Sequence, residues 1–219
     1  MKIYVVGSSK NKFLPLDNIR EKFLIDQPHE GDNIDFLNPW YCELTGLYYL
    51  WKHVDDEIVG LEHYRRYFVN NKGNLLSENE INDILKDNDV ICKKWVFKEH
   101  KQKNAYTFLK SGVYFSYYNK FLSFLPTNEK LFIENELNTL PYFAQCNMFI
   151  CKKKIIDEYM DWLFTYIINF SATELHKAPR IIGYVAEFIF GAWLKMKGYK
   201  IQWNKVNVFN QNLTKLLNE

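Results

Sequence analysis

The sequence has no apolar run long enough to cross a membrane. A spanning helix needs about 20 mostly apolar residues in succession, and no segment of this chain reaches that length. The first residues enter a strand-like segment directly, without the apolar stretch of a signal peptide. We therefore expect a cytoplasmic protein. Its mildly basic charge also fits peripheral association with the anionic inner face of a membrane.

Cysteine, glycine and proline are sparse, with 4, 9 and 6 residues among 219. No stretch rich in Pro, Gly or Ser divides the chain, and no internal repeat is visible. We expect residues 1–219 to form a single domain whose tail frays after about residue 205. The cysteines show neither a Cys-x-x-Cys motif nor zinc-type spacing, so each is interpreted as a reduced core thiol: Cys42, Cys92, Cys146 and Cys151.

Basic and acidic residues are nearly balanced in number. Lys and Arg number 28 against 26 Asp and Glu, which gives a formal net charge of +2. Nucleic acid is not an expected partner, because a domain that binds it is usually clearly basic. Aromatic residues are instead abundant, at 17% of the chain. Most are expected in the core, although Tyr and Trp, which join an apolar ring to a polar group, also suit clefts that bind sugars.

Strand-like and helix-like segments alternate along the chain, which predicts an α/β fold. Short apolar runs predict strands at residues 2–6, 57–61, 89–93, 148–151 and 201–203. Apolar spacing, together with capping residues, predicts helices over residues 38–53, 77–85, 155–168 and 180–197. Asn38 and Pro39 are expected to start the first of these helices, and Gly198 is expected to end the last.

The strand expected at 57–61 leads into His63, Tyr64, Arg65 and Arg66. Guanidinium groups bind phosphate through two parallel hydrogen bonds, in a planar geometry that lysine does not match. The pattern therefore predicts an anion site at the rim of a sheet. The alternative is that the arginines pair with acidic neighbours and only brace the fold, the candidates being Glu43, Asp56 and Glu62.

Three blocks of the sequence carry motifs in a recognisable order. Residues 31–68 contain GDNI, NPWYCELTGLYYLWK and VGLEHYRRYF; residues 146–164 contain CNMFICKK and DEYMDWLF; residues 180–194 contain RIIGYVAEFIF. In these blocks the chain resembles a bacterial capsular-polysaccharide glycosyltransferase family that was long catalogued as a domain of unknown function. The match is poor over residues 95–140.

The resemblance implies a GT-A-like single domain with a mixed, mostly parallel central sheet flanked by helices. It implies transfer of a sugar from a UDP-sugar onto a growing capsular or exopolysaccharide glycan, free or polyprenyl-linked. Some members are inverting galactofuranosyltransferases, so UDP-galactofuranose is the expected donor. The family's first strand usually ends in a His-Lys pair, whereas this chain has Ser8, Ser9 and Lys10 there. A non-catalytic module that binds a nucleotide sugar or a glycan is the alternative.

Donor binding is expected at Arg65 and Arg66, with Lys10 beside them. Asp32 and Asn33 precede the first expected helix, where they either contact the nucleotide or only form an Asx turn. Contacts to the sugar or the acceptor are expected from Asn147, Tyr64 and Arg180. For Asn147, at the rim of an expected strand, a backbone cap is an equal alternative.

An inverting transfer also needs a base that removes the proton of the acceptor hydroxyl. The expected catalytic residues are Glu187, His63 and Glu62. Glu187 lies among apolar residues of a helix, where a carboxylate must pair or have a raised pKa. It either pairs with Arg180 or Arg66 or faces the cleft. Glu43 is a further candidate, although a carboxylate in the first turn of a helix is also favoured by the helix dipole.

Many GT-A enzymes hold Mn²⁺ or Mg²⁺ with an Asp-x-Asp motif at the end of a strand. Asp87, Asn88 and Asp89 match that motif, but they precede an expected strand instead of ending one. We interpret them as a turn. No metal ligand is assigned from the sequence, and Mn²⁺ or Mg²⁺ stays open as a cofactor.

Overall fold

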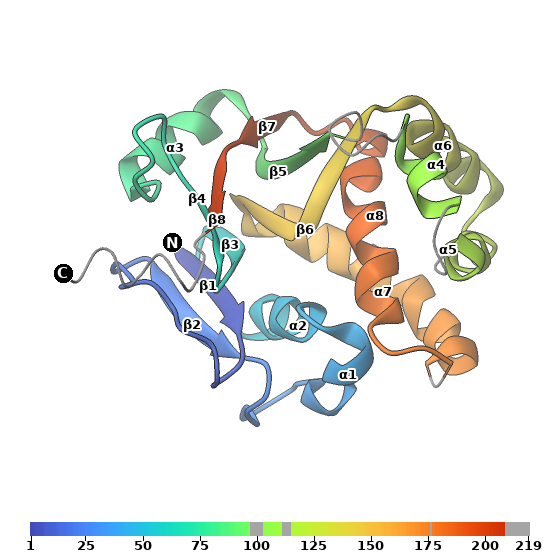
Figure 1. Ribbon diagram of the computed structural model, residues 1–219, viewed down its shortest axis with the longest axis horizontal. Coiled ribbons are helices and arrows are strands. Elements are labelled where there is room, and N and C mark those ends of the chain that lie inside the picture. Colours follow the sequence, from blue (N-terminus) through green and yellow to red (C-terminus); the bar gives the residue numbers. More distant parts are fainter. Residues whose placement is uncertain (97–102, 111–114, 176, 209–219) are drawn as a thin grey trace.

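The computed structural model describes residues 1–96, 103–110, 115–175 and 177–208 (Figure 1). Within them the strands are β1 (Lys2–Gly7), β2 (Arg20–Leu24), β3 (Ile58–His63), β4 (Arg66–Phe68), β5 (Val90–Val96), β6 (Tyr142–Lys152), β7 (Ile201–Asn204) and β8 (Val206–Val208). The helices are η1 (Asp35–Leu37), α1 (Asn38–Tyr41), α2 (Leu44–His53), α3 (Glu78–Asp87), α4 (Ala105–Lys110), α5 (Phe115–Leu122), α6 (Thr127–Thr139), α7 (Lys153–Glu174) and α8 (Ile181–Met196).

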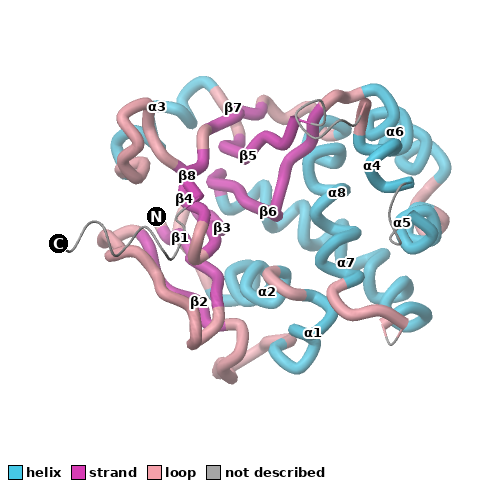
Figure 2. Tube along the Cα trace, in the orientation of Figure 1, coloured by secondary structure: helices cyan, strands magenta, loops and turns pink. Residues whose placement is uncertain are grey.

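The strands form one mixed sheet in the order β2-β1-β3-β6-β5-β7 (Figure 2). β2, β1 and β3 run parallel, β6 runs antiparallel to both β3 and β5, and β7 runs parallel to β5. Five of these six strands therefore point the same way, which confirms the expected mixed, mostly parallel sheet. The short strand β4 pairs with β3 on one side and with β8 on the other.

Both faces of the sheet are buried. On one face, Tyr4, Leu61 and Phe149 join a large core built with the apolar sides of α2, α7 and α8. On the other face, Ile3 and Ile150 pack in a smaller core with residues of α3. Alternate residues of each strand point to opposite faces, so a strand between two layers has to be apolar throughout. This burial on both faces explains why residues 3–6 of β1 are all apolar.

Helix α8 lies unusually close to the sheet, because it carries glycines where it touches its neighbours. A Cβ on Gly191 would lie 2.9 Å from Cβ of Ala144 in β6. A Cβ on Gly183 would lie 3.1 Å from the carbonyl oxygen of Tyr41 in α1. Gly183, Glu187 and Gly191 are spaced four residues apart, so they share one helix face. The glycines thus bring Glu187 against β6.

We expect Gly191→Ala to destabilise the protein. Helix propensity alone favours Ala over Gly by about 1 kcal/mol, whereas overpacking a core contact costs about 1–3 kcal/mol. Because the new Cβ would lie 2.9 Å from Cβ of Ala144, we expect the cost of overpacking to be the larger effect. Urea unfolding should show a lower free energy of unfolding. Adding Ala144→Gly should restore part of the loss. A Gly191→Ala variant more stable than the parent would contradict the close packing.

The helix expected over residues 38–53 is broken. α1 ends at Cys42, whose φ of 53° and ψ of −129° cannot continue a helix, and α2 starts two residues later. Asn38 does not cap the helix as expected, because η1 leads directly into α1 and Asn38 is already helical. The expected capping box of Ser77 and Glu80 at the start of α3 is confirmed.

Several elements lie outside the expected set. β2, β4 and β8 are too short or too polar to show a strand pattern in the sequence, and the aromatic-rich middle of the chain forms α4, α5 and α6. Residues 206–208 are ordered as β8, so the chain stays structured past residue 205, while residues 209–219 lie outside the described part. The described residues include no helix that is both long and apolar enough to cross a bilayer.

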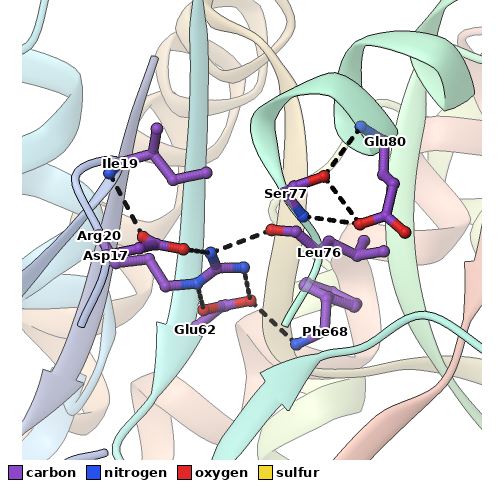
Figure 3. Close-up of polar contacts among 8 residues, drawn as sticks. All are labelled: Asp17, Ile19, Arg20, Glu62, Phe68, Leu76, Ser77 and Glu80. Atoms are coloured by element: carbon purple, nitrogen blue, oxygen red, sulfur yellow. Dashed lines mark hydrogen bonds and ion pairs between the residues drawn. The ribbon is translucent and has the colours of Figure 1, made fainter. Parts of the chain in front are cut away.

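A buried ion pair fixes the hairpin of β3 and β4 (Figure 3). Arg20 of β2 donates from Nε to Glu62 of β3 at 2.7 Å, and neither side chain is exposed. Glu62 also accepts from the backbone N–H of Phe68 in β4 at 2.9 Å, and Arg20 donates to the carbonyl of Leu76 at 3.1 Å. Asp17 completes the set, 2.6 Å from Arg20. The network thus joins β2, β3, β4 and the segment before α3.

Candidate functional site

A cavity of about 610 Å³ opens where the parallel strands β1 and β3 end. The end of β1, the β3–β4 turn, α1 and the start of α2, the middle of β6 and the first half of α8 line it. The crevice at the carboxyl ends of parallel strands is the usual place for ligands in α/β sheets. The charged and titratable side chains on its wall include Glu43, His63, Arg65, Arg66, Arg180 and Glu187.

The β3–β4 hairpin presents the two adjacent arginines. β3 ends at His63, which pairs with Arg66 across the two-residue turn formed by Tyr64 and Arg65. The turn packs tightly on β1, because a Cβ on Gly7 would lie 2.9 Å from Cβ of Tyr64. Only a residue without a side chain fits at that point of β1.

Both guanidinium groups are available at the pocket. Arg65 is exposed and lies over the ring of Tyr64, with 4.9 Å between its Cζ and the ring centroid. Arg66 is half-buried on the same wall. Within the described part of the chain, neither arginine forms an ion pair with an acidic side chain. The structure therefore does not support the alternative in which they pair with Glu43, Asp56 or Glu62.

Glu187 projects from α8 into the pocket and accepts a hydrogen bond from the backbone N–H of Cys146 at 2.8 Å. Burial, reinforced by the charge of Glu43, raises the pKa of Glu187 to about 7. The hydrogen bond from Cys146 and the positive charges of Arg66 and Lys93 oppose the rise. A carboxyl group that titrates near neutral pH can take up a proton and release it again, as a general base must.

His63 is oriented by the same backbone segment. Its Nε2 lies 2.8 Å from the carbonyl oxygen of Cys146. Because a carbonyl only accepts, Nε2 carries the proton in this contact, which leaves Nδ1 as the ring nitrogen able to accept one. Burial lowers the pKa of His63, and Arg66 adds to the effect, so the neutral ring is favoured.

β6 is irregular where it meets these groups. Cys92 of β5 pairs with Phe149, but Lys94 pairs with Ala144, so residues 145–148 of β6 face a single residue of β5. We call residues 145–148 the β6 bulge. A bulge leaves backbone groups outside the ladder. Here those groups meet the side chains of the pocket.

Strained backbone conformations cluster around this pocket. Among the described residues, the non-glycine positions with positive φ are Cys42, Cys146, Asn147 and Arg180. Cys42 directly precedes Glu43, Cys146 and Asn147 lie in the β6 bulge, and Arg180 starts α8. Such conformations cost about 1–3 kcal/mol each and cluster at functional sites. This clustering marks the cavity independently of the charges that line it.

The thiols on the wall are not nucleophiles at neutral pH. Burial raises the pKa of Cys42 to about 11 and that of Cys146 to about 12. Because the thiolate is the reactive form, both groups stay inert. The four cysteines are free, as expected, although Cys42 and Cys146 border the pocket instead of lying only in the core.

Six of the residues selected from the sequence lie on the wall of the cavity or point to it. Glu187, His63, Tyr64, Arg65, Arg66 and Arg180 all line it. Arg180 is exposed at the start of α8, with its guanidinium carbon 5.2 Å from the centroid of the Tyr184 ring. Residues far apart in the sequence, in β3, β4 and α8, thus form one site.

Glu62 is not at the site. Its side chain is fully buried on the opposite side of β3 from His63, in the ion pair with Arg20. Successive residues of a strand point to opposite faces, so the residue before His63 cannot share its pocket. The expectation that Glu62 acts in catalysis is not supported by this placement.

Asp32, Asn33 and Lys10 also do not line the cavity. Asp32 accepts from the hydroxyl of Tyr48 at 2.9 Å, and Asn33 donates to the carbonyl of His29 at 2.7 Å. Oδ1 of Asn33 accepts from the backbone N–H of Asp35 at 3.2 Å, which is the Asx turn that the alternative predicts. Lys10 is exposed on the loop after β1, whose neighbouring residues Ser8 and Asn11 do reach the wall.

Asn147 is buried, with 2% exposure, and does not line the cavity. Its Nδ2 donates to Oε1 of Glu43 at 2.9 Å. The expected contact with a sugar or acceptor is therefore replaced by a contact with a carboxylate of the wall. Glu43, the further candidate for the base, lines the cavity.

The described residues contain no cluster of three or more His, Cys, Asp or Glu side chains that could hold an ion. Asp89 of the Asp-x-Asp match accepts from the backbone N–H of Lys200 at 2.8 Å, and Asn88 donates to the carbonyl of Ile84 at 3.0 Å. The motif is a turn between α3 and β5, as interpreted from its position.

Comparison with known proteins agrees with the fold. Residues 2–198 match the family described as Domain of unknown function (DUF4422), so the chain belongs to that family. No curated protein matches the chain. Among solved structures, it is similar to the "WbbM bifunctional glycosytransferase apo structure", with a TM-score of 0.75 and 25% sequence identity over 95% of this chain. This chain spans 45% of that protein's length. The fold is GT-A-like.

Proposed function

We propose that this protein is a glycosyltransferase that moves a sugar from a nucleotide-sugar donor onto a glycan acceptor. One observation carries the proposal: a single pocket is lined by Arg65 and Arg66, which form no ion pair among the described residues, and by the half-buried Glu187, whose pKa burial raises to about 7. The similarity to a glycosyltransferase structure supports it. A volume of about 610 Å³ lies in the range of small-molecule and cofactor sites.

The arginines serve the donor. As the sugar leaves the diphosphate, negative charge grows on the phosphate oxygens, and preorganised cations stabilise it. Arg65 lies in the two-residue turn after β3, Arg66 starts β4, and Arg180 lines the same cavity. We assign the diphosphate to this cationic rim.

Glu187 serves the acceptor. The acceptor hydroxyl gives its proton to the Glu187 carboxylate, and its oxygen forms the new bond to the anomeric carbon. The bond between that carbon and the diphosphate oxygen breaks, and the nucleoside diphosphate leaves with the electron pair. Attack from the face opposite the leaving group inverts the anomeric centre. His63, with Nδ1 as its free acceptor, is the second candidate for the proton.

The identities of the donor and the acceptor are proposed from the resemblance of the sequence. UDP-galactofuranose is the proposed donor, and a capsular or exopolysaccharide glycan, free or polyprenyl-linked, is the proposed acceptor. Action in the cytoplasm at the inner face of the membrane fits that acceptor. Transfer measured with and without a chelator tests whether Mn²⁺ or Mg²⁺ is required.

Binding and transfer assays with Arg65→Ala and Arg66→Ala test the proposal. Removing one preorganised donor to a developing oxyanion typically costs about 10²–10³-fold in turnover, and we expect a loss of this size in at least one variant, with weaker UDP binding. Lys86→Ala is the matched control, because it removes one positive charge from the exposed surface of α3. UDP binding without transfer to any acceptor would favour the non-catalytic module. Unchanged binding and turnover in both arginine variants would reject the anion site.

A further inference from the structure

The β6 bulge holds two carboxylates of the pocket at once. The backbone N–H of Cys146 donates to Glu187 at 2.8 Å, and the side-chain amide of the next residue, Asn147, donates to Glu43 at 2.9 Å. Glu43 is itself largely buried, with 9% exposure. Two acidic groups from different helices are thus fixed on the same wall by adjacent residues of one strand.

Asn147 adopts an unfavourable backbone conformation while its amide donates to Glu43. Its φ is 49°, a left-handed conformation that costs a non-glycine residue about 1–3 kcal/mol. A carboxylate only accepts hydrogen bonds, so the amide must turn its NH₂ group toward Glu43. That orientation leaves Oδ1 of Asn147 buried without a hydrogen-bond partner in the described structure, which costs about 1–3 kcal/mol more. Packing alone gives no reason to retain an amide here.

The two carboxylates are not equivalent. Glu43 precedes the first turn of α2, where the positive end of the helix dipole favours its charge, and it has the Asn147 amide as a donor. Glu187 lies in the middle of α8, away from either helix end, and accepts a hydrogen bond from the Cys146 N–H. When two nearby carboxyl groups share a site, the less stabilised one holds its proton longer. Here that group is Glu187.

Deepening the function proposed above, on which this step rests, we propose that Asn147 is a positioning residue: its amide holds the Glu43 carboxylate on the wall that Glu43 shares with Glu187, so that Glu187 is the carboxylate of the pocket that takes up the proton. Asn147 touches neither substrate in this arrangement. It acts through Glu43, and Glu43 acts through its charge on Glu187.

Other charges face Glu187 and set the size of the effect. Arg66 and Lys93 act against protonation of Glu187, while Glu43 and burial favour it. The remaining titratable groups of the same wall are His63, Tyr64, Arg65, Cys42, Cys146, Arg180 and Tyr184. Burial favours the neutral forms of His63 and of both thiols, so Glu43 is the negative charge in this set that can hold a proton on Glu187.

A carboxyl titration tests the inference without using activity. The protein is labelled with [δ-¹³C]glutamate, and the Glu187 signal is assigned by its loss in Glu187→Gln. In Glu43→Gln, which removes the charge, we expect the pKa of Glu187 to fall by about one unit. In Asn147→Gly, which keeps the left-handed backbone without strain but deletes the amide, we expect a smaller fall in the same direction. The low-pH limb of the kcat profile should move with the titration.

Glu78→Gln is the matched control, because it removes the same charge from the exposed start of α3. If the pKa of Glu187 in Glu43→Gln and Asn147→Gly moves no more than in Glu78→Gln, the inference is overturned. If Asn147→Gly does not fold, Glu43→Gln decides alone. If the parent protein transfers sugar normally but the pKa of Glu187 is the same in these variants, only this inference is rejected. The expected titration without transfer in the parent protein rejects the proposed function instead.

Discussion

Glu187→Gln should remove sugar transfer while leaving the protein at least as stable as its parent. Positioned acid–base groups contribute about 10²–10⁴-fold to rate, and a Gln side chain cannot take up the acceptor proton. We expect kcat to fall by that factor, with UDP affinity unchanged, because the cationic rim stays intact. Gln can still accept the hydrogen bond that Glu187 receives from Cys146. Single-turnover transfer and UDP titration are the two measurements.

The pH dependence gives an independent check on Glu187. A base must be unprotonated to act, so kcat of the parent protein should rise with pH up to about 7, the pKa of Glu187. The stability of the fold changes with pH in the opposite direction to kcat. The unfolded chain releases this proton near pH 4.5, before the folded protein does, so the raised pKa destabilises the fold increasingly between about pH 4.5 and 7.

Glu187→Gln should therefore gain stability above pH 7, by up to about 3 kcal/mol, and should show no gain below pH 4.5. Urea unfolding at the two pH values measures the difference. Glu78→Gln, on the exposed part of α3, should change neither kcat nor this pH dependence. A lower melting temperature with intact turnover would make Glu187 a structural residue.

Arg20→Met should be the most destabilising of the proposed substitutions. It leaves Glu62 fully buried without its guanidinium partner, and breaking a buried ion pair by removing one partner costs about 3–5 kcal/mol. Urea unfolding at neutral pH measures this loss. The exposed pair of Lys2 in β1 and Glu21 in β2 also links two neighbouring strands of the sheet. Lys2→Met, its matched control, should cost about 0–1 kcal/mol.

A double variant separates pairing from packing. Arg20→Met with Glu62→Leu removes both charges and leaves apolar groups of similar size, so it should be more stable than Arg20→Met alone. A double variant no better than the single one would mean that the bonds to Phe68 and Leu76, not the pair itself, hold the hairpin. Glu62→Gln should keep transfer in proportion to its folded fraction. A further loss would return Glu62 to the candidates for the base.

Much of the framework follows from local pattern. The apolar runs at β1, β3, β5, β6 and β7 were expected strands, and the capping box of α3 and the glycine after α8 marked real helix ends. These signals are local, because burial on both faces and capping both leave their mark within a few residues. Short strands such as β2 and β4 leave no such mark, since their partners, not their composition, make them strands.

For the site, the sequence by itself determined which side chains have the right chemistry. Adjacent arginines and a histidine after an apolar strand, and a glutamate inside an apolar helix, each stand out without coordinates. Only the tertiary structure decided which of them meet. It put Glu62 and His63 on opposite faces of one strand, and it turned Asn147 from a sugar contact into a support for Glu43. The reason is physical: charge and hydrogen-bonding capacity belong to a residue type, whereas burial and distance depend on how β3, β6 and α8 pack against one another.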